Sequence, residues 1–209
     1  MNASANPFKS STTPMVKLST AELQQADAAH HLHPFSDNHA LAKNGVRFIE
    51  RAQGVYIWDS DGNRFIDGFA GLWCVNLGYG RKELVEAASK QLSTLPYYNL
   101  FFKTSTAPAT QLAQAIAELA PKGMNHVLFT GSGSEANDSI FRLVRRYWDL
   151  QEKPEKKHFI SRKNAYHGST VCGASLGGMS WMHSQGDLPI AGISHIEQPY
   201  HFELGNGLD

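Results

Sequence analysis

Apolar side chains recur with helical spacing in three segments, which we expect to be amphipathic helices over 82–95, over 108–120 and around 140–148. In chain order these positions are Leu84, Val85, Ala88, Leu92 and Leu95, then Leu112, Ile116 and Leu119, then Ile140, Leu143, Val144, Tyr147 and Trp148. Pro96 and Pro121 close the first two segments. A shorter helix is expected over 21–29, ending before Pro34.

Two other patterns predict strands. The β-prone runs 54–58 and 64–67 flank the pair Asp61-Gly62, which is typical of a hairpin. Residues 127–130 and 158–161 are short strand-like runs on either side of the third helix. A strand, a helix and a strand within about 35 residues indicate a βαβ unit, so the fold class should be α/β with a parallel sheet.

The chain changes character near residues 105–123. We therefore expect a flexible N-terminus over 1–20, a segment with the hairpin over 21–105 and an α/β portion over 106–209. The stretch 68–80 combines four glycines with Trp73, Cys74 and Tyr79. Such a mixture indicates backbone that passes close to a ligand or to another chain.

Composition narrows the class of protein. Nineteen basic and nineteen acidic side chains give zero formal charge, which argues against a nucleic-acid partner. A content of 42% hydrophobic residues is that of a globular chain, and no run approaches the roughly 18 apolar residues of a membrane span.

Cys74 and Cys172 form no disulfide framework and suit a reducing, cytoplasmic location. The first twenty residues lack the apolar core of a secretory signal.

His30, His31 and His33 raise the question of a metal site. Zinc sites usually draw ligands from separate elements with a fourth partner, and no Cys or Glu is nearby. We therefore expect a loop of solvated or packed histidines and no metal.

The most informative element is the strand-to-helix turn 130–137. Free N–H groups at a helix start carry positive partial charge, and glycines let a phosphate approach the backbone. A capping box formed by Ser132 and Glu135 would need no ligand. Because two glycines and two serines in four positions exceed what a cap requires, we favour an anion site.

The same turn also fits a dinucleotide fingerprint, Gly131-x-Gly133-x-x-Ala136. The second strand ends at Arg162 rather than at the acid that would hold a ribose hydroxyl, so an NADP-dependent oxidoreductase is the alternative. Such a fingerprint normally opens its domain, whereas more than a hundred residues precede it here.

Residues 131–137 (GSGSEAN) and 165–170 (AYHGST) resemble the class III aminotransferases. Segments 31–35, 54–62 and 70–76 resemble the branch that includes the ω-amine:pyruvate and putrescine-type transaminases, and segments 175–179 and 186–190 continue the match. The resemblance implies the type I fold of pyridoxal 5'-phosphate enzymes, with 21–105 in the small domain and 106–209 beginning the large one. It also implies transfer of an amino group from an ω-amine to pyruvate or another keto acid.

The resemblance assigns roles to individual residues. Gly133 and Ser134 match the phosphate-binding pair, with Ser132 beside them, and Tyr166 matches the aromatic that stacks on the cofactor ring. His167 supports the ring or braces the loop. The substrate pocket is implied to include four aromatic residues: Phe35, Trp73, Tyr98 and Phe101. Tyr98, Phe101 and Phe102 match a segment that reaches toward the second subunit's site in a homodimer, and a local hydrophobic patch is the alternative for this cluster.

The family's Schiff-base lysine has no counterpart here. None of the eleven lysines, Lys163 included, stands in the expected context, so the sequence resembles the N-terminal part of a longer enzyme and assigns no catalytic residue. Loss of the proton-shuttling base should cost roughly a hundred- to ten-thousand-fold in rate. We expect the isolated chain not to turn over, and a non-catalytic dimerisation or binding remnant is a further alternative.

Overall fold

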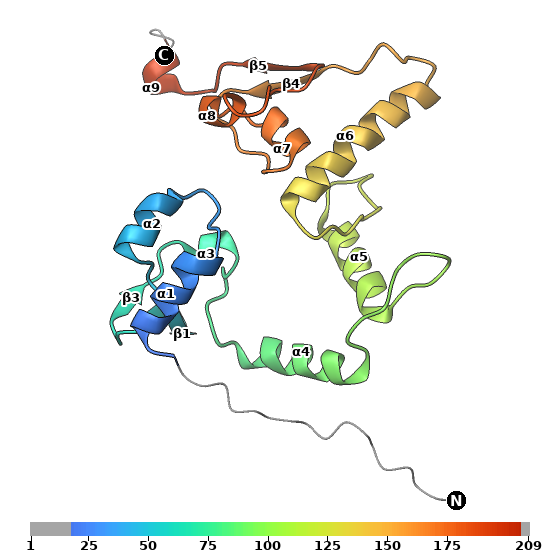
Figure 1. Cartoon of the computed structure of the whole chain (residues 1–209). Helices are drawn as coiled ribbons and strands as arrows, with labels where there is room; N and C mark the ends of the chain where they lie inside the picture. The colour runs from blue at the N-terminus through green and yellow to red at the C-terminus, as the bar shows by residue number, and fades with distance from the viewer. Residues whose placement is uncertain (1–17, 206–209) are drawn as a thin grey trace, which may run out of the picture. The chain divides into compact units, whose positions relative to one another are not determined.

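The computed structural model describes residues 18–205, which fall into two compact units, Met1–Phe101 and Phe102–Asp209 (Figure 1). Each unit is described by itself. The flexible N-terminus expected over 1–20 lies outside the described residues except for 18–20, and Thr20 already begins the first helix.

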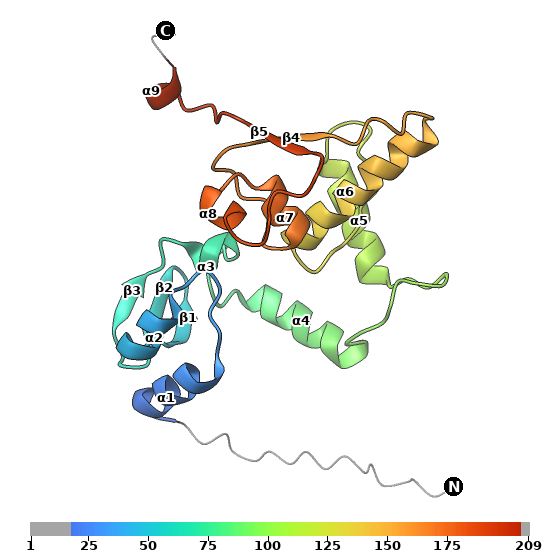
Figure 2. The same ribbon diagram turned by 45° about the horizontal axis from the view of Figure 1, so that its top comes forward.

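The first unit is built on a three-stranded antiparallel sheet in the order β1-β2-β3 (Figure 2). Its elements are α1 (Thr20–His30), α2 (Asn38–Asn44), β1 (Ile49–Gln53), β2 (Tyr56–Asp59), β3 (Arg64–Ile66), α3 (Ala70–Trp73) and α4 (Lys82–Thr94). The predicted hairpin is confirmed as β2 and β3, with Ile57 opposite Phe65. Strand β1 was not predicted, because Glu50 and Arg51 interrupt its apolar pattern.

Side-chain caps set the local boundaries in this unit. Ser19 and Glu22 form a reciprocal capping box that begins α1. The Asp37 carboxylate accepts from the backbone N–H groups that begin α2. At the hairpin turn the buried Asp59 carboxylate accepts from the backbone N–H of Asn63 at 2.8 Å and of Asp61 at 3.1 Å. The turn is therefore held from inside by one carboxylate.

The second unit holds a parallel pair of strands, β4 and β5, with two short helices between them in the chain. Its elements are α5 (Ala107–Leu119), α6 (Gly133–Leu150), β4 (Phe159–Arg162), α7 (Val171–Leu176), α8 (Ser180–His183), β5 (Ile193–Ile196) and α9 (His201–Leu204). The predicted strand over 127–130 was wrong: those residues are irregular, since no strand among the described residues pairs with them. The parallel pair is β4 with β5, joined through α7 and α8 (Figure 1).

The buried residues of the second unit gather mainly in and directly after α7, and two aromatic rings stack between α6 and β4. The rings of Phe141 and Phe159 stack with centroids 4.4 Å apart, and the Arg145 guanidinium lies 4.0 Å from the centroid of the Phe141 ring. The same guanidinium donates to the carbonyls of Lys157 and Ala191. One arginine therefore joins α6 to the segments that precede β4 and β5.

Helices α4 and α5 expose the apolar stripes that predicted them. None of their residues is buried, and Leu84, Leu92 and Leu112 are each more than half exposed. Apolar stripes of this kind are usually covered in a stable fold. Among residues 18–205, no helix is both long enough and apolar enough to span a bilayer.

Candidate functional site

The start of α6 is capped by its own turn. Ser132 Oγ accepts the backbone N–H of Glu135 at 3.2 Å, as a capping box requires. The return bond differs from the prediction, because the Glu135 carboxylate accepts from the backbone N–H of Gly131 at 2.7 Å rather than from Ser132. The cap therefore satisfies the backbone N–H groups of Gly131, which precedes the N-cap residue Ser132, and of Glu135, the third residue of the helix.

Two amides of that first turn stay available. The backbone N–H groups of Gly133 and Ser134 have no acceptor among the described residues. A Cβ on Gly133 would meet nothing within 4 Å, so the space above this backbone is open. Because α6 is 18 residues long, its first turn carries the full positive partial charge of a helix dipole. This arrangement suits a phosphate group.

The loop between β4 and α7 is bonded onto this helix start. Ser134 Oγ accepts the backbone N–H of Ser169 at 3.0 Å, and Asn137 Nδ2 donates to the His167 carbonyl at 2.7 Å. The two bonds join segments that are 35 and 30 residues apart in the chain. They bring three of the predicted cofactor residues, Ser134, Tyr166 and His167, into one place.

Gly168 allows this close approach. It is buried with φ +127°, and a Cβ there would lie 2.6 Å from Ser134 Oγ and 2.9 Å from Ser134 Cα. Only a glycine fits between the loop and the helix at this point. Gly168 and Ser169 were not among the predicted site residues, and the signal that could have found them is the Gly-Ser-Thr run directly before a helix.

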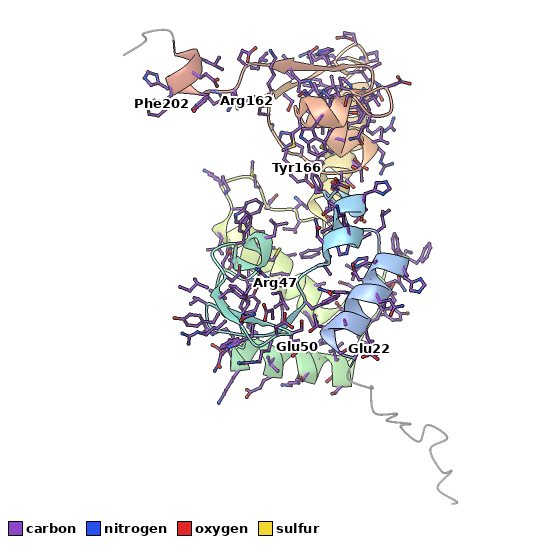
Figure 3. The ribbon with its side chains drawn as sticks, turned by 60° about the vertical axis from the view of Figure 1, so that its left-hand side comes forward. Glu22, Arg47, Glu50, Arg162, Tyr166 and Phe202 are labelled. Atoms are coloured by element: carbon purple, nitrogen blue, oxygen red, sulfur yellow. The ribbon has the colours of Figure 1, made fainter. Side chains whose placement is uncertain are left out.

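Tyr166 lies in the same loop, where Figure 3 labels it. Its hydroxyl is 3.1 Å from Ser169 Oγ, and its side chain is 51% exposed. The hydroxyl contact fixes one end of the side chain while half of its surface stays open to a ligand. A buried tyrosine would have had no such surface.

A second side-chain contact, between Thr170 and Asp138, also joins the β4–α7 loop to α6. Thr170 Oγ1 donates to Asp138 Oδ1 at 2.8 Å and accepts the backbone N–H of Gly173 at 3.1 Å, which caps α7. Burial raises the pKa of the Cys172 thiol, and the nearby Asp138 carboxylate raises it further. Both effects disfavour the thiolate, the reactive form of a cysteine.

The four predicted substrate-pocket aromatics all belong to the first unit. Phe35, Trp73, Tyr98 and Phe101 are each more than half exposed. Their grouping around a substrate stays a prediction.

The short element α3, which ends at Trp73, is a left-handed turn. Residues 70–73 all have positive φ, between +48° and +65°, which costs non-glycine residues roughly 1–2 kcal/mol each. The Asp67 carboxylate holds the turn: it accepts from the backbone N–H of Gly71 at 2.8 Å and of Phe69 at 3.1 Å, and from the Tyr79 hydroxyl at 2.7 Å. The Tyr79 hydrogen bond is the main cause that lowers the pKa of Asp67. Strain of this kind concentrates at functional sites.

Comparison with known protein families matches residues 39–206 to the class-III aminotransferases. The chain belongs to this family. The fold agrees, because an (S)-enantioselective ω-transaminase from Thermomicrobium roseum superposes with a TM-score of 0.87 at 38% identity, covering 92% of this chain and 42% of that one. The ω-transaminase from Pseudomonas jessenii in complex with PMP gives a TM-score of 0.85 at 41% identity, over 87% of this chain and 40% of that one. The α/β class and the type I fold are thereby confirmed.

Among curated relatives, a putrescine–pyruvate aminotransferase of Pseudomonas aeruginosa is 58% identical over 189 residues, which are 90% of this chain and 41% of the relative. A diaminobutyrate–2-oxoglutarate transaminase of Halomonas elongata is 42% identical over 84% of this chain and 36% of its own length. The chain therefore spans about two fifths of the length of the relatives it matches.

Class-III aminotransferases use pyridoxal phosphate, so family membership agrees with the predicted cofactor. It leaves the NADP-dependent oxidoreductase without support. The structure weakens that alternative as well, because the dinucleotide fingerprint requires a strand directly before the turn, and residues 127–130 do not form one.

Proposed function

We propose that this chain forms part of an aminotransferase that moves an amino group from an ω-amine, either a diamine or an aryl or alkyl amine, to pyruvate or another keto acid. The name of the P. aeruginosa relative and the ω-transaminases among the similar structures support this reaction. The substrates are small molecules, and nothing in the proposal requires a nucleic acid or a membrane.

The bond between Ser134 and Ser169 is the observation that carries the proposal. It holds the loop of Tyr166 against a helix start where the amides of Gly133 and Ser134 have no acceptor within residues 18–205. These amides, with the Ser132 and Ser134 hydroxyl protons, would hold the cofactor phosphate. The residues present therefore fit pyridoxal 5'-phosphate.

The rest of the loop would act on the cofactor ring. Tyr166 would stack on one face of the ring and exclude water from it, with its hydroxyl kept near Ser169. His167 would brace the loop, since its carbonyl is already bonded to Asn137. Bound pyridoxal phosphate supplies an electron sink for the carbon that carries the amine.

Phe35, Trp73, Tyr98 and Phe101 would form the walls of the amine pocket. Their exposed aromatic surfaces suit linear or aryl amines, which bind by burying apolar area. In a homodimer, which we also propose, Tyr98 and Phe101 would lie at the neighbouring subunit's site. The free thiols of Cys74 and Cys172 are consistent with the cytoplasmic location that we propose.

Within this division of roles, the chain binds and positions but holds no catalytic residue. The base that moves a proton between substrate and cofactor would lie in the part of the relatives that this chain does not span. We therefore propose that the 209-residue chain alone does not transaminate.

Two measurements on the purified chain test this function. Pyridoxamine phosphate, which has no aldehyde to react with surface lysines, should quench its tryptophan fluorescence saturably, whereas NADPH should not. With putrescine, pyruvate and added pyridoxal 5'-phosphate, the chain alone should form no alanine. Mixed with a polypeptide that carries the remaining three fifths of the P. aeruginosa relative, it should form alanine.

Tight NADPH binding without pyridoxamine phosphate binding would contradict the cofactor assignment. Turnover by the chain alone would contradict the proposed division of roles. Cofactor binding without restored turnover in the mixture would favour the non-catalytic remnant.

A further inference from the structure

Three side chains of the first unit converge beside the end of α1. His31 Nδ1 lies 3.0 Å from Asp27 Oδ1, and His33 Nε2 lies 2.8 Å from Asp27 Oδ2. The two imidazole rings are 4.1 Å apart, and one ligand atom from each of the three residues lies within 4.8 Å of the others. Figure 3 labels Glu22 at the start of this helix, and the cluster lies at its other end.

The backbone that carries these side chains is fixed on both sides of the cluster. The backbone N–H of His31 donates to the Asp27 carbonyl at 2.9 Å and closes the last turn of α1. The backbone N–H of His33 donates to Asn38 Oδ1 at 2.9 Å, and Asn38 Nδ2 donates back to the His33 carbonyl at 3.3 Å. The three donor groups are therefore preorganised rather than gathered by chance from mobile chains.

Two imidazoles and one carboxylate form the donor set of many zinc sites. At metal–ligand distances near 2.1 Å, tetrahedral ligand atoms stand roughly 3.4 Å apart. The two contacts with the Asp27 oxygens, at 3.0 and 2.8 Å, would open by about half an ångström to admit an ion. Asp27 is 12% exposed and His33 is 22%, while His31 is 60% exposed, which leaves a path for the ion. One negative charge on the ligands suits a divalent cation.

We propose that Asp27, His31 and His33 bind a divalent transition metal of the zinc class, with water completing the coordination. Each imidazole would coordinate through the nitrogen that now faces Asp27 and would carry its N–H on the other nitrogen. The ion would tie the end of α1 to the loop that leads to α2, a structural role that is independent of the proposed transaminase function.

This proposal differs from the sequence-based expectation of no metal. That expectation sought a Cys or Glu beside the histidines, whereas the third ligand is Asp27, one helical turn before His31. Side chains at i and i+4 share a helix face, so the spacing between Asp27 and His31 was the available signal.

Co²⁺ titration of the untagged 209-residue chain tests the proposal, because protein-bound Co²⁺ gives visible absorption bands that Zn²⁺ abolishes by competition. One equivalent should bind. Loss of a residue that only hydrogen-bonds to a metal ligand typically lowers metal affinity about 10–100-fold. Loss of the proposed ligand itself in His31→Gln should therefore weaken Co²⁺ binding by at least about 100-fold. His31 is exposed, so this variant should keep the far-UV circular dichroism of the wild type.

His30→Gln is the matched control, since His30 is the adjacent exposed histidine and lies outside the cluster. It should bind as the wild type does. Absence of Co²⁺ bands at millimolar Co²⁺, or equal losses of Co²⁺ affinity in His30→Gln and His31→Gln, would overturn the proposal. The Asp27 carboxylate would then only hydrogen-bond the two histidines. Asp27→Asn, which keeps the shape of the side chain, should abolish the bands as well.

Discussion

Ser134 and Ser169, 35 residues apart, are joined by a 3.0 Å hydrogen bond from the backbone N–H of Ser169 to the Ser134 hydroxyl oxygen. Because that oxygen is the acceptor, the Ser134 hydroxyl proton remains free to donate. One side chain can therefore hold the β4–α7 loop and a phosphate oxygen at the same time. The phosphate site and the ring-stacking Tyr166 are coupled through this residue.

Ser134→Ala should remove both interactions. Charge-assisted hydrogen bonds contribute about 1.5–3 kcal/mol, so pyridoxamine phosphate should bind roughly 10- to 100-fold more weakly, as measured by calorimetry. Ser139→Ala, a turn and a half further along α6, is the control and should bind normally. Equal affinity of Ser134→Ala and the wild type would mean that the phosphate sits elsewhere.

Gly168→Ala should force the loop away from α6, because the added Cβ would lie 2.6 Å from Ser134 Oγ. We expect a loss of roughly 1–3 kcal/mol in the free energy of unfolding together with loss of pyridoxamine phosphate binding. Gly186→Ala is the matched control: its φ is also positive, at +65°, but nothing lies within 4 Å of the new Cβ. It should lose stability and keep binding. If Gly168→Ala binds as well as Gly186→Ala, the close approach is unimportant.

The elements that could be predicted are those whose pattern lies within a single segment of the sequence. Helices α4, α5 and α6 follow from their apolar periodicity, and the hairpin follows from its Asp-Gly turn. Residues 127–130 look like a strand, but a strand also requires a paired neighbour, which one segment cannot specify.

The free amides at Gly133 and Ser134 were predictable because a glycine–serine turn before a helix has a local meaning. The position of the β4–α7 loop beside these amides could not be predicted, since the contact of Ser134 with Ser169 depends on tertiary folding. For the same reason the left-handed turn at Trp73 could not be predicted. It depends on Asp67 and on Tyr79, twelve residues further along the chain.

Acid should release the left-handed turn at Trp73. The folded-state pKa of Asp67 is lowered, so its stabilisation is present above the unfolded value of 3.8 and is lost as the pH falls through the folded value, below pH 3.8. Tyr79→Phe removes the largest cause of the shift and should move the transition upward toward pH 3.8. Hydrogen exchange of residues 69–74 at a series of pH values measures this. Identical profiles for Tyr79→Phe and the wild type would refute the role of the tyrosine hydroxyl.

Arg145→Ala should destabilise the second unit by about 1–3 kcal/mol, because it removes a cation–π contact with Phe141 and hydrogen bonds from a charged group to two carbonyls. Thermal unfolding followed by circular dichroism measures the loss. Arg142→Ala, on the exposed side of the same helix, should change the melting temperature little. A comparable loss in both variants would show that general helix propensity, rather than the stacked arginine, is responsible.

Amide chemical shifts in the ¹⁵N-labelled chain test the central claim most directly. On titration with pyridoxamine phosphate, the amide signals of Gly133 and Ser134 should move first and furthest, and the same concentrations of pyridoxamine, which lacks the phosphate, should leave them in place. Equal movement with both compounds, or movement confined to other residues, would contradict a phosphate site at the start of α6.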